Sequence, residues 1–195
     1  MQTDSPISPD GRPRLDTGRL IMGLFLASLG MGFGALLVFY FILRARAAVW
    51  PPPGTPRLPT ALWLSTVLIL ASSGTMQAAV RSIRHGRQAA FRTAVVATIL
   101  LALGFVASQI VNWGLAVAAR MPPDLNMFSI TFYLLTGLHG LHVLGGLVPL
   151  TIVAARSFRG RYTPENHLGV RFCAWYWHFV DVIWLVVFAS LLLAG

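Results

Sequence analysis

The hydrophobic positions of this chain gather in five long runs, which short polar segments separate. The runs cover Leu20–Leu43, Ala61–Val80, Thr93–Ala119, Ile130–Ala154 and Cys173–Ala194. A helix needs about 20 apolar residues to cross the hydrocarbon core of a bilayer, and each run meets that length. Period-2 alternation, which is the pattern of a transmembrane strand, is absent. The pattern therefore predicts an all-α fold, a polytopic membrane helical bundle with five transmembrane helices.

The composition agrees with a membrane protein. The chain has 195 residues, of which 56% are hydrophobic and 11% charged, and this balance excludes an ordinary soluble domain. Residues 1–18 are polar and rich in proline and glycine, so we expect a flexible cytoplasmic tail. Residues 19–195 then form a single membrane domain. The first run is too long for the core of a signal peptide, and we expect it to be retained.

The arginines are unevenly distributed, and this asymmetry predicts the orientation. Eleven of the fifteen basic residues, all arginine, precede the first run or follow the second and fourth runs. Connecting segments on the cytoplasmic side carry an excess of basic residues. We therefore expect a cytoplasmic N-terminus and a periplasmic C-terminus. The net charge of +9 is spread over these segments, and no compact basic module for nucleic acid is present.

Ionisable side chains within two of the runs are the candidate functional residues. His178 and Asp181 are three apart in the last run, and His139 and His142 are three apart in the fourth. Residues at this spacing share one face of a helix. An acid at membrane depth costs at least about 2.5–3.5 kcal/mol on insertion scales, so it faces other helices. We expect all four side chains to form one buried polar cluster between the two helices.

Neutral polar residues in the second and third runs have a simpler interpretation. Such side chains usually hydrogen-bond to neighbouring helices. They are Ser72, Ser73, Thr75, Gln77, Ser108, Gln109 and Asn112. The single cysteine, Cys173, excludes an intramolecular disulfide, and its apolar neighbours indicate inert packing.

From the residues alone, three classes of function compete. A metal or haem site could use the histidines, but a carboxylate-bridged metal pair needs more acids than Asp181. A small membrane transporter or proton relay could use the same groups, although no inverted repeat is present. A structural subunit fits a chain without a phosphate-binding loop, a nucleophile–base pair or a CxxC motif. This reasoning stops at an integral membrane subunit.

Two C-terminal motifs resemble one known family. The run Trp175–Trp184, within residues 163–191, and the run Phe132–Gly146 resemble signatures of subunit III of the haem-copper terminal oxidases. Weaker similarity lies at Trp50–Pro52, Ser72–Ala79 and Leu103–Gln109. The five runs resemble the short form of this subunit, which lacks the first two helices of the longer form.

The resemblance implies a non-redox role in a respiratory complex of the bacterial plasma membrane. In this family, subunit III has no catalytic or metal-binding residue. Haem and copper belong to partner subunits, and the partners are catalytic subunit I together with subunit II. The subunit binds phospholipid and supports proton uptake and turnover stability in an oxidase that takes electrons from cytochrome c or quinol. Trp50, Arg81 and Arg84 are the candidates here for contact with lipid head groups.

The chain also departs from the family at three positions. Glutamate is usual where Leu29, Asn112 and Arg171 stand here. A proton-buffering or lipid-orienting role that depends on those acids is therefore not expected. The departures keep open a relative associated with nitric oxide reductase, with a small transporter as a further alternative.

Overall fold

The structure is a computed structural model that describes residues 17–193 of the chain. The described residues form five helices, and the expected tail, residues 1–18, lies almost wholly outside them. The helices are α1 (Thr17–Arg46), α2 (Leu62–Arg84), α3 (Gln88–Ala118), α4 (Met127–Phe158) and α5 (Leu168–Leu192). Each is long and apolar enough to cross a membrane. The predicted all-α class and the five candidate spans are confirmed.

The helices are longer than the apolar runs that predicted them. Helix α1 has 30 residues and α4 has 32, which corresponds to about 45–48 Å at 1.5 Å per residue. This length spans a whole bilayer, head groups included. The additional turns carry arginines, such as Arg44 in α1 and Arg156 in α4. The helices therefore extend into the polar layer, where a charged side chain is solvated.

Local sequence signals explain where the helices begin and end. The α2–α3 turn contains Gly86 at φ 69°, a left-handed conformation that glycine adopts without steric cost. The side chain of Asn126 caps α4 by accepting a hydrogen bond from the Ser129 amide at 2.9 Å. Prolines between residues 51 and 59 keep the segment between α1 and α2 out of helix.

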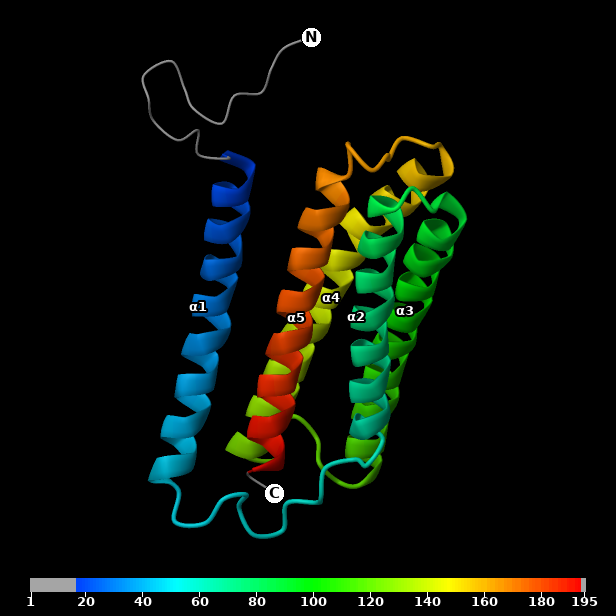
Figure 1. The fold of residues 1–195 in the computed structure, drawn as a ribbon. Helices are drawn as coiled ribbons and strands as arrows, with labels where there is room; N and C mark the ends of the chain where they lie inside the picture. The colour runs from blue at the N-terminus through cyan, green and yellow to red at the C-terminus, as the bar shows by residue number, and fades with distance from the viewer. Residues whose placement is uncertain (1–16, 194–195) are drawn as a thin grey trace, which may run out of the picture.

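Helices α2 to α5 pack into a bundle, and α1 stands to one side of it, next to α5 and α4 (Figure 1). In the most apolar stretch of α1 only 6% of the residues are buried, whereas in the most apolar stretch of α5 50% are buried. One end of the molecule holds the start of α1, the α2–α3 turn and the α4–α5 loop, and we call it the Arg-rich end (Figure 1). The opposite end holds the proline-containing segment 47–61, and we call it the Pro-loop end.

Side-chain hydrogen bonds join the helices of the bundle. The indole N–H groups of Trp177 and Trp184 on α5 donate to Ser72 and Thr66 on α2, each at 3.0 Å. Further bonds join α2 to α3 and α3 to α4: Ser65–Ser108, Ser65–Asn112, Thr75–Thr98 and Trp113–Thr136. The expectation of hydrogen bonds between helices is confirmed for these neutral polar residues, except Gln109, whose amide has no partner in the structure.

Candidate functional site

The structure brings His178 and Asp181 together on the face of α5 that meets α2. Nδ1 of His178 lies 3.9 Å from a carboxylate oxygen of Asp181, whose side chain is 5% exposed. The same nitrogen bonds to the hydroxyl of Ser73 at 2.7 Å, and Nε2 lies 3.3 Å from the amide oxygen of Gln77. The polar neighbours of this pair therefore come from α2.

The histidines of α4 lie elsewhere, which corrects the expectation that all four residues share one cluster. His139 is fully buried, and neither ring nitrogen has a hydrogen-bond partner in the structure. Its neighbours are the rings of Phe33, Phe105 and Trp184. Nδ1 of His142 bonds to a carbonyl one turn earlier on its own helix, that of Leu138. The rotation of α4 points its imidazoles at aromatic rings, whereas α2 offers hydroxyl and amide groups to α5.

An apolar pocket of about 440 Å³ lies between α1, α4 and α5, and we call it the α1 groove. Its residues are Met22 and Phe25 of α1, Gly145 and Pro149 of α4, and Gly169, Phe172, Cys173 and Tyr176 of α5. The Tyr176 hydroxyl donates to the carbonyl of His142 at 2.8 Å, so its polar atom is satisfied. The surface left in the groove is apolar.

A polar pocket of about 290 Å³ adjoins the α1 groove at the Arg-rich end. Gly169 lines both pockets, and Arg156, Arg161, Tyr162 and Asn166 complete the polar one. Gly160, at φ 65°, turns the chain at the end of α4. The amide of Arg161 then bonds back to the carbonyl of Arg156. This turn explains how two arginines five positions apart come to line one pocket.

The α4–α5 loop that carries this pocket is held against the bundle. The side-chain amide of Gln88 on α3 donates to the carbonyl of Tyr162 at 2.8 Å. The ring of Tyr162 packs edge-on against Phe91 with a centroid separation of 6.0 Å. Arg161 therefore extends from an anchored loop, and Arg156 extends from the last turn of α4.

Trp50, a predicted head-group residue, lies at the Pro-loop end. Its indole N–H reaches the Tyr40 hydroxyl at 3.4 Å, and its ring packs edge-on against Tyr40 and Phe128. It also lines a pocket of about 500 Å³ between α1 and the start of α4, together with Arg46 and Asp124. Trp50 thus helps attach α1 and borders an opening between α1 and α4.

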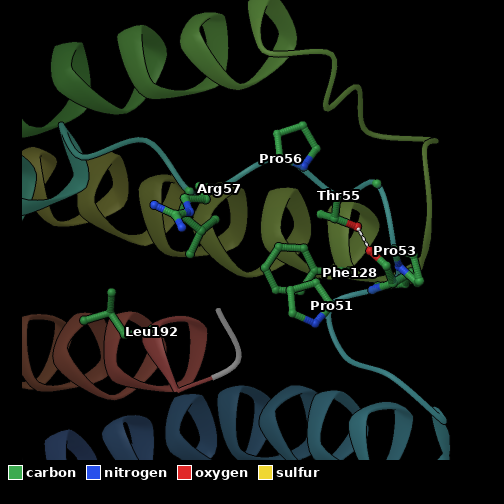
Figure 2. Close-up of a pocket in the computed structure, with 10 residues that line it drawn as sticks. Pro51, Pro53, Thr55, Pro56, Arg57, Phe128 and Leu192 are labelled. Carbon is green, nitrogen blue, oxygen red and sulfur yellow. Dashed lines mark hydrogen bonds between the residues drawn. The ribbon is translucent and has the colours of Figure 1, made fainter.

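The proline-containing segment forms a further pocket of about 440 Å³ over the ends of α4 and α5. Figure 2 shows Pro51, Pro53, Pro56 and Arg57 of this segment around Phe128, with Leu192 nearby. The Thr55 hydroxyl donates to the Pro52 carbonyl at 2.7 Å (Figure 2). Asn126 in turn donates to Thr55. These bonds fix the segment onto the N-terminus of α4.

Arg81 and Arg84, the other two predicted head-group residues, lie in different surroundings. Both side chains are exposed near the end of α2. Arg84 lines a small pocket between α2 and α5, whereas Arg81 lines neither that pocket nor any of the four above. Sequence reasoning missed Arg156 and Arg161, because their grouping depends on the turn at Gly160.

Within residues 17–193, no group of three or more histidine, cysteine, aspartate or glutamate residues is placed to hold a metal ion. The pair His178 and Asp181 contributes two such groups. The described residues offer hydrogen bonds between helices and apolar grooves with arginines beside them.

Comparison with known proteins identifies the family. Residues 15–195 match the family described as cytochrome c oxidase subunit III. The chain is 37% identical over 175 residues to "Cytochrome c oxidase subunit 3" of Arabidopsis thaliana, covering 86% of this chain and 65% of the plant protein. It is 35% identical to the Synechocystis subunit of the same name, covering 85% and 70% of the two chains.

A third relative is nearer in length. "Probable cytochrome c oxidase subunit 3" of Mycobacterium bovis is 34% identical over 166 residues, and the match covers 85% of this chain and 82% of the relative. The family match over residues 15–195 includes both C-terminal motifs. This chain, a multi-pass membrane protein, belongs to the cytochrome c oxidase subunit III family.

Proposed function

We propose that this chain is a non-redox subunit of a haem-copper respiratory oxidase in the bacterial plasma membrane. The complex reduces oxygen, and its haem and copper lie in the partner subunits I and II. Family membership supports this proposal. The names of the relatives favour cytochrome c over quinol as electron donor, and an oxidase over a nitric oxide reductase complex.

The role proposed for the chain within that complex is to bind phospholipid and stabilise the catalytic subunit and its proton uptake. The observation that carries it is that the apolar α1 groove lies next to the pocket of Arg156 and Arg161, with Gly169 lining both. An acyl chain fits an apolar groove, and arginine pairs with phosphate through charge-assisted hydrogen bonds. A phospholipid placed along α1 satisfies both pockets at once.

The position of α1 gives this lipid a structural purpose. Helices in a bilayer gain no hydrophobic driving force from meeting each other, because lipid tails are equally apolar. Helix α1 is mostly unburied within the chain, so a lipid between α1 and the bundle adds dispersion contacts to both. The pocket at Trp50 offers an opening between α1 and α4 at the Pro-loop end. Arg81 and Arg84 remain proposed contacts for head groups at the Arg-rich end.

Site-directed variants test lipid binding at the groove. The double variant Arg156→Gln/Arg161→Gln removes both charges from the polar pocket. Arg159→Gln is the control, because Arg159 is exposed between these two residues and lines neither pocket. We expect the double variant to lose one tightly held phospholipid per chain, measured by native mass spectrometry of the purified chain, and Arg159→Gln to keep it. Equal lipid retention in all three proteins would exclude the groove as the binding site.

Removal of the whole subunit tests its role in the complex. The oxidase purified without this chain is compared with the intact complex by oxygen consumption over many turnovers. Initial activity should be retained and should then decay faster, because stability rather than chemistry is lost. Immediate loss of activity with an assembled catalytic core would assign the chain to the reaction itself, and an unchanged time course would remove the proposed role.

A further inference from the structure

A separate pocket lies between α2 and α5 at the Arg-rich end. It has a volume of about 210 Å³ and includes Arg84 and Gln77 of α2 with Arg171, Trp175 and His178 of α5. None of these residues lines the α1 groove or its polar extension. We call it the α2–α5 pocket.

Two guanidinium groups border this pocket without an acidic counterpart. In residues 17–193 the structure shows no salt bridge and no side-chain hydrogen bond from Arg84 or Arg171, and no carboxylate lines the pocket. The guanidinium carbon of Arg171 lies 5.9 Å from the centre of the Trp175 ring, and its Nε atom is buried without a partner. The ring supports the planar group, and the terminal N–H donors of Arg171 remain available for an anion.

The floor of the pocket is polar as well. His178 is partly exposed, at 34% of its side chain. Its two ring nitrogens contact Ser73 and Gln77. These contacts use both nitrogens of the imidazole, and the side-chain NH2 of Gln77 still supplies N–H donors. The pocket therefore combines two fixed positive charges with further donors behind them.

This charge pattern argues against a proton entry at the same place. Two guanidinium groups at the mouth repel cations, although the imidazole of His178 beneath them is a base. Asp181 lies one turn deeper and is buried against α2, and the arginines stand between it and the Arg-rich end. The pocket is suited to an anion that approaches from the membrane surface.

We propose that the α2–α5 pocket binds a single phosphate group. Arg84 and Arg171 pair with its oxygens, and the side-chain NH2 of Gln77 donates to it from below. Arginine recognises phosphate through paired N–H donors. The end of α2 and the first turn of α5 place the pocket at head-group level, so an anionic phospholipid is one source of the phosphate and a soluble phosphate compound is the other. The site is independent of the lipid proposed for the α1 groove.

The test uses the full chain in nanodiscs of phosphatidylcholine with a small fraction of phosphatidylglycerol. Retained phosphatidylglycerol is counted by native mass spectrometry in the wild type, Arg84→Gln, Arg171→Gln and the double variant. Each single substitution should weaken retention about tenfold or more, because it removes hydrogen bonds between charged groups. Arg171→Lys, which keeps the charge, should weaken it less than Arg171→Gln.

Arg87→Gln is the matched control, because Arg87 is exposed in the α2–α3 turn at the same end of the molecule and lies outside the pocket. A general surface charge contributes at most about fivefold to anionic-lipid binding. Inorganic phosphate, added at constant ionic strength with chloride as the control anion, separates the two sources. Displacement of lipid by phosphate, or saturable phosphate binding that Arg84→Gln and Arg171→Gln weaken, supports a soluble source, whereas lipid retention unaffected by phosphate supports a lipid source.

The proposal is overturned if neither source binds, or if Arg87→Gln weakens binding as much as the pocket variants. Unchanged helical circular dichroism and melting of Arg84→Gln exclude loss of folding as the cause. Retention at this site by Arg156→Gln/Arg161→Gln shows that the two sites are separate. Loss of lipid from the α1 groove in that variant, or its retention there, then does not affect the conclusion for the α2–α5 pocket.

Discussion

At the scale of single residues, Asp181 is the side chain with the most demanding environment. Its carboxylate is buried in a span, and its nearest ionisable neighbour is Nδ1 of His178 at 3.9 Å. Neither carboxylate oxygen has a hydrogen-bond partner in the structure. The residue fills space at the α2–α5 interface, so its volume and its carboxylate group contribute separately to the stability of the fold.

Substitution of Asp181 separates these two contributions. Asp181→Ala should lower the free energy of unfolding by about 1–3 kcal/mol, because it leaves a void and removes the neighbour of His178. Asp181→Asn should be milder, because it keeps the volume. Thermal melting in detergent measures both, with the exposed Val182→Ala as control. An Asp181→Leu protein that melts like the wild type would show that the carboxylate is dispensable.

Gly146 is a second residue that the packing singles out. A Cβ at this position would lie 2.6 Å from a ring carbon of Tyr176 and 3.1 Å from Trp177. Gly146→Ala should therefore destabilise the α4–α5 contact by about 1–3 kcal/mol through overpacking. Gly140, on the same helix, has no atom within 4 Å of the place where a Cβ would lie. Gly140→Ala should be neutral or stabilising by up to about 1 kcal/mol, because alanine favours helix; equal melting of both variants would contradict the close packing.

At the scale of elements, α1 differs from the other four helices. It is attached at three levels: Phe25 stacks near Tyr176, Phe33 packs against His142, and the Tyr40 hydroxyl donates to the carbonyl of Ser190. Arg44 also donates to the Leu193 carbonyl at 2.7 Å. These contacts hold a helix whose remaining surface is available to lipid or to a partner subunit.

Loss of the central contact should loosen α1 without unfolding the bundle. Phe33 is 2% exposed, whereas Phe39 on the same helix is 49% exposed. Phe33→Ala should lower the free energy of unfolding by at most about 3–5 kcal/mol, and by less where lipid fills the space. It should also raise the rate of amide hydrogen exchange in α1, while the amides of α2 to α5 stay protected. Phe39→Ala should leave exchange unchanged. Equal exchange in both variants would mean that Phe33 does not anchor α1.

At the scale of the whole molecule, the distribution of arginine predicts the orientation. The start of α1, the α2–α3 turn and the α4–α5 loop lie at one end (Figure 1), and they carry most of the basic residues. The positive-inside rule predicts that this Arg-rich end faces the cytoplasm. Both arginine-lined pockets at this end would then face the inner leaflet.

Reporter fusions test that orientation. A fusion after Gly86, in the α2–α3 turn, should report the cytoplasm, and a fusion after Gly195 should report the periplasm. A periplasmic phosphatase and a cytoplasmic fluorescent protein serve as complementary reporters at each site. Reports of the same side from both sites would contradict the odd number of spans, and reversed reports would contradict the arginine argument.

Local sequence by itself determined the five spans and the family motifs around His139 and Asp181. Each depends on hydropathy or residue order within a short segment, and these properties do not need the rest of the chain. The sequence also predicted that polar residues in α2 and α3 form hydrogen bonds, because polar groups within a bilayer require partners.

Tertiary structure alone decided which faces meet. His178 and Asp181 face Ser73 and Gln77 of α2, while His139 faces aromatic rings. The pairing of Arg156 with Arg161 and of Arg84 with Arg171 around pockets was likewise settled by helix rotation and by one turn. Hydropathy cannot choose among apolar faces in a lipid solvent, because burial against a helix and burial against lipid are similar. Shape and a few hydrogen bonds between distant residues make that choice.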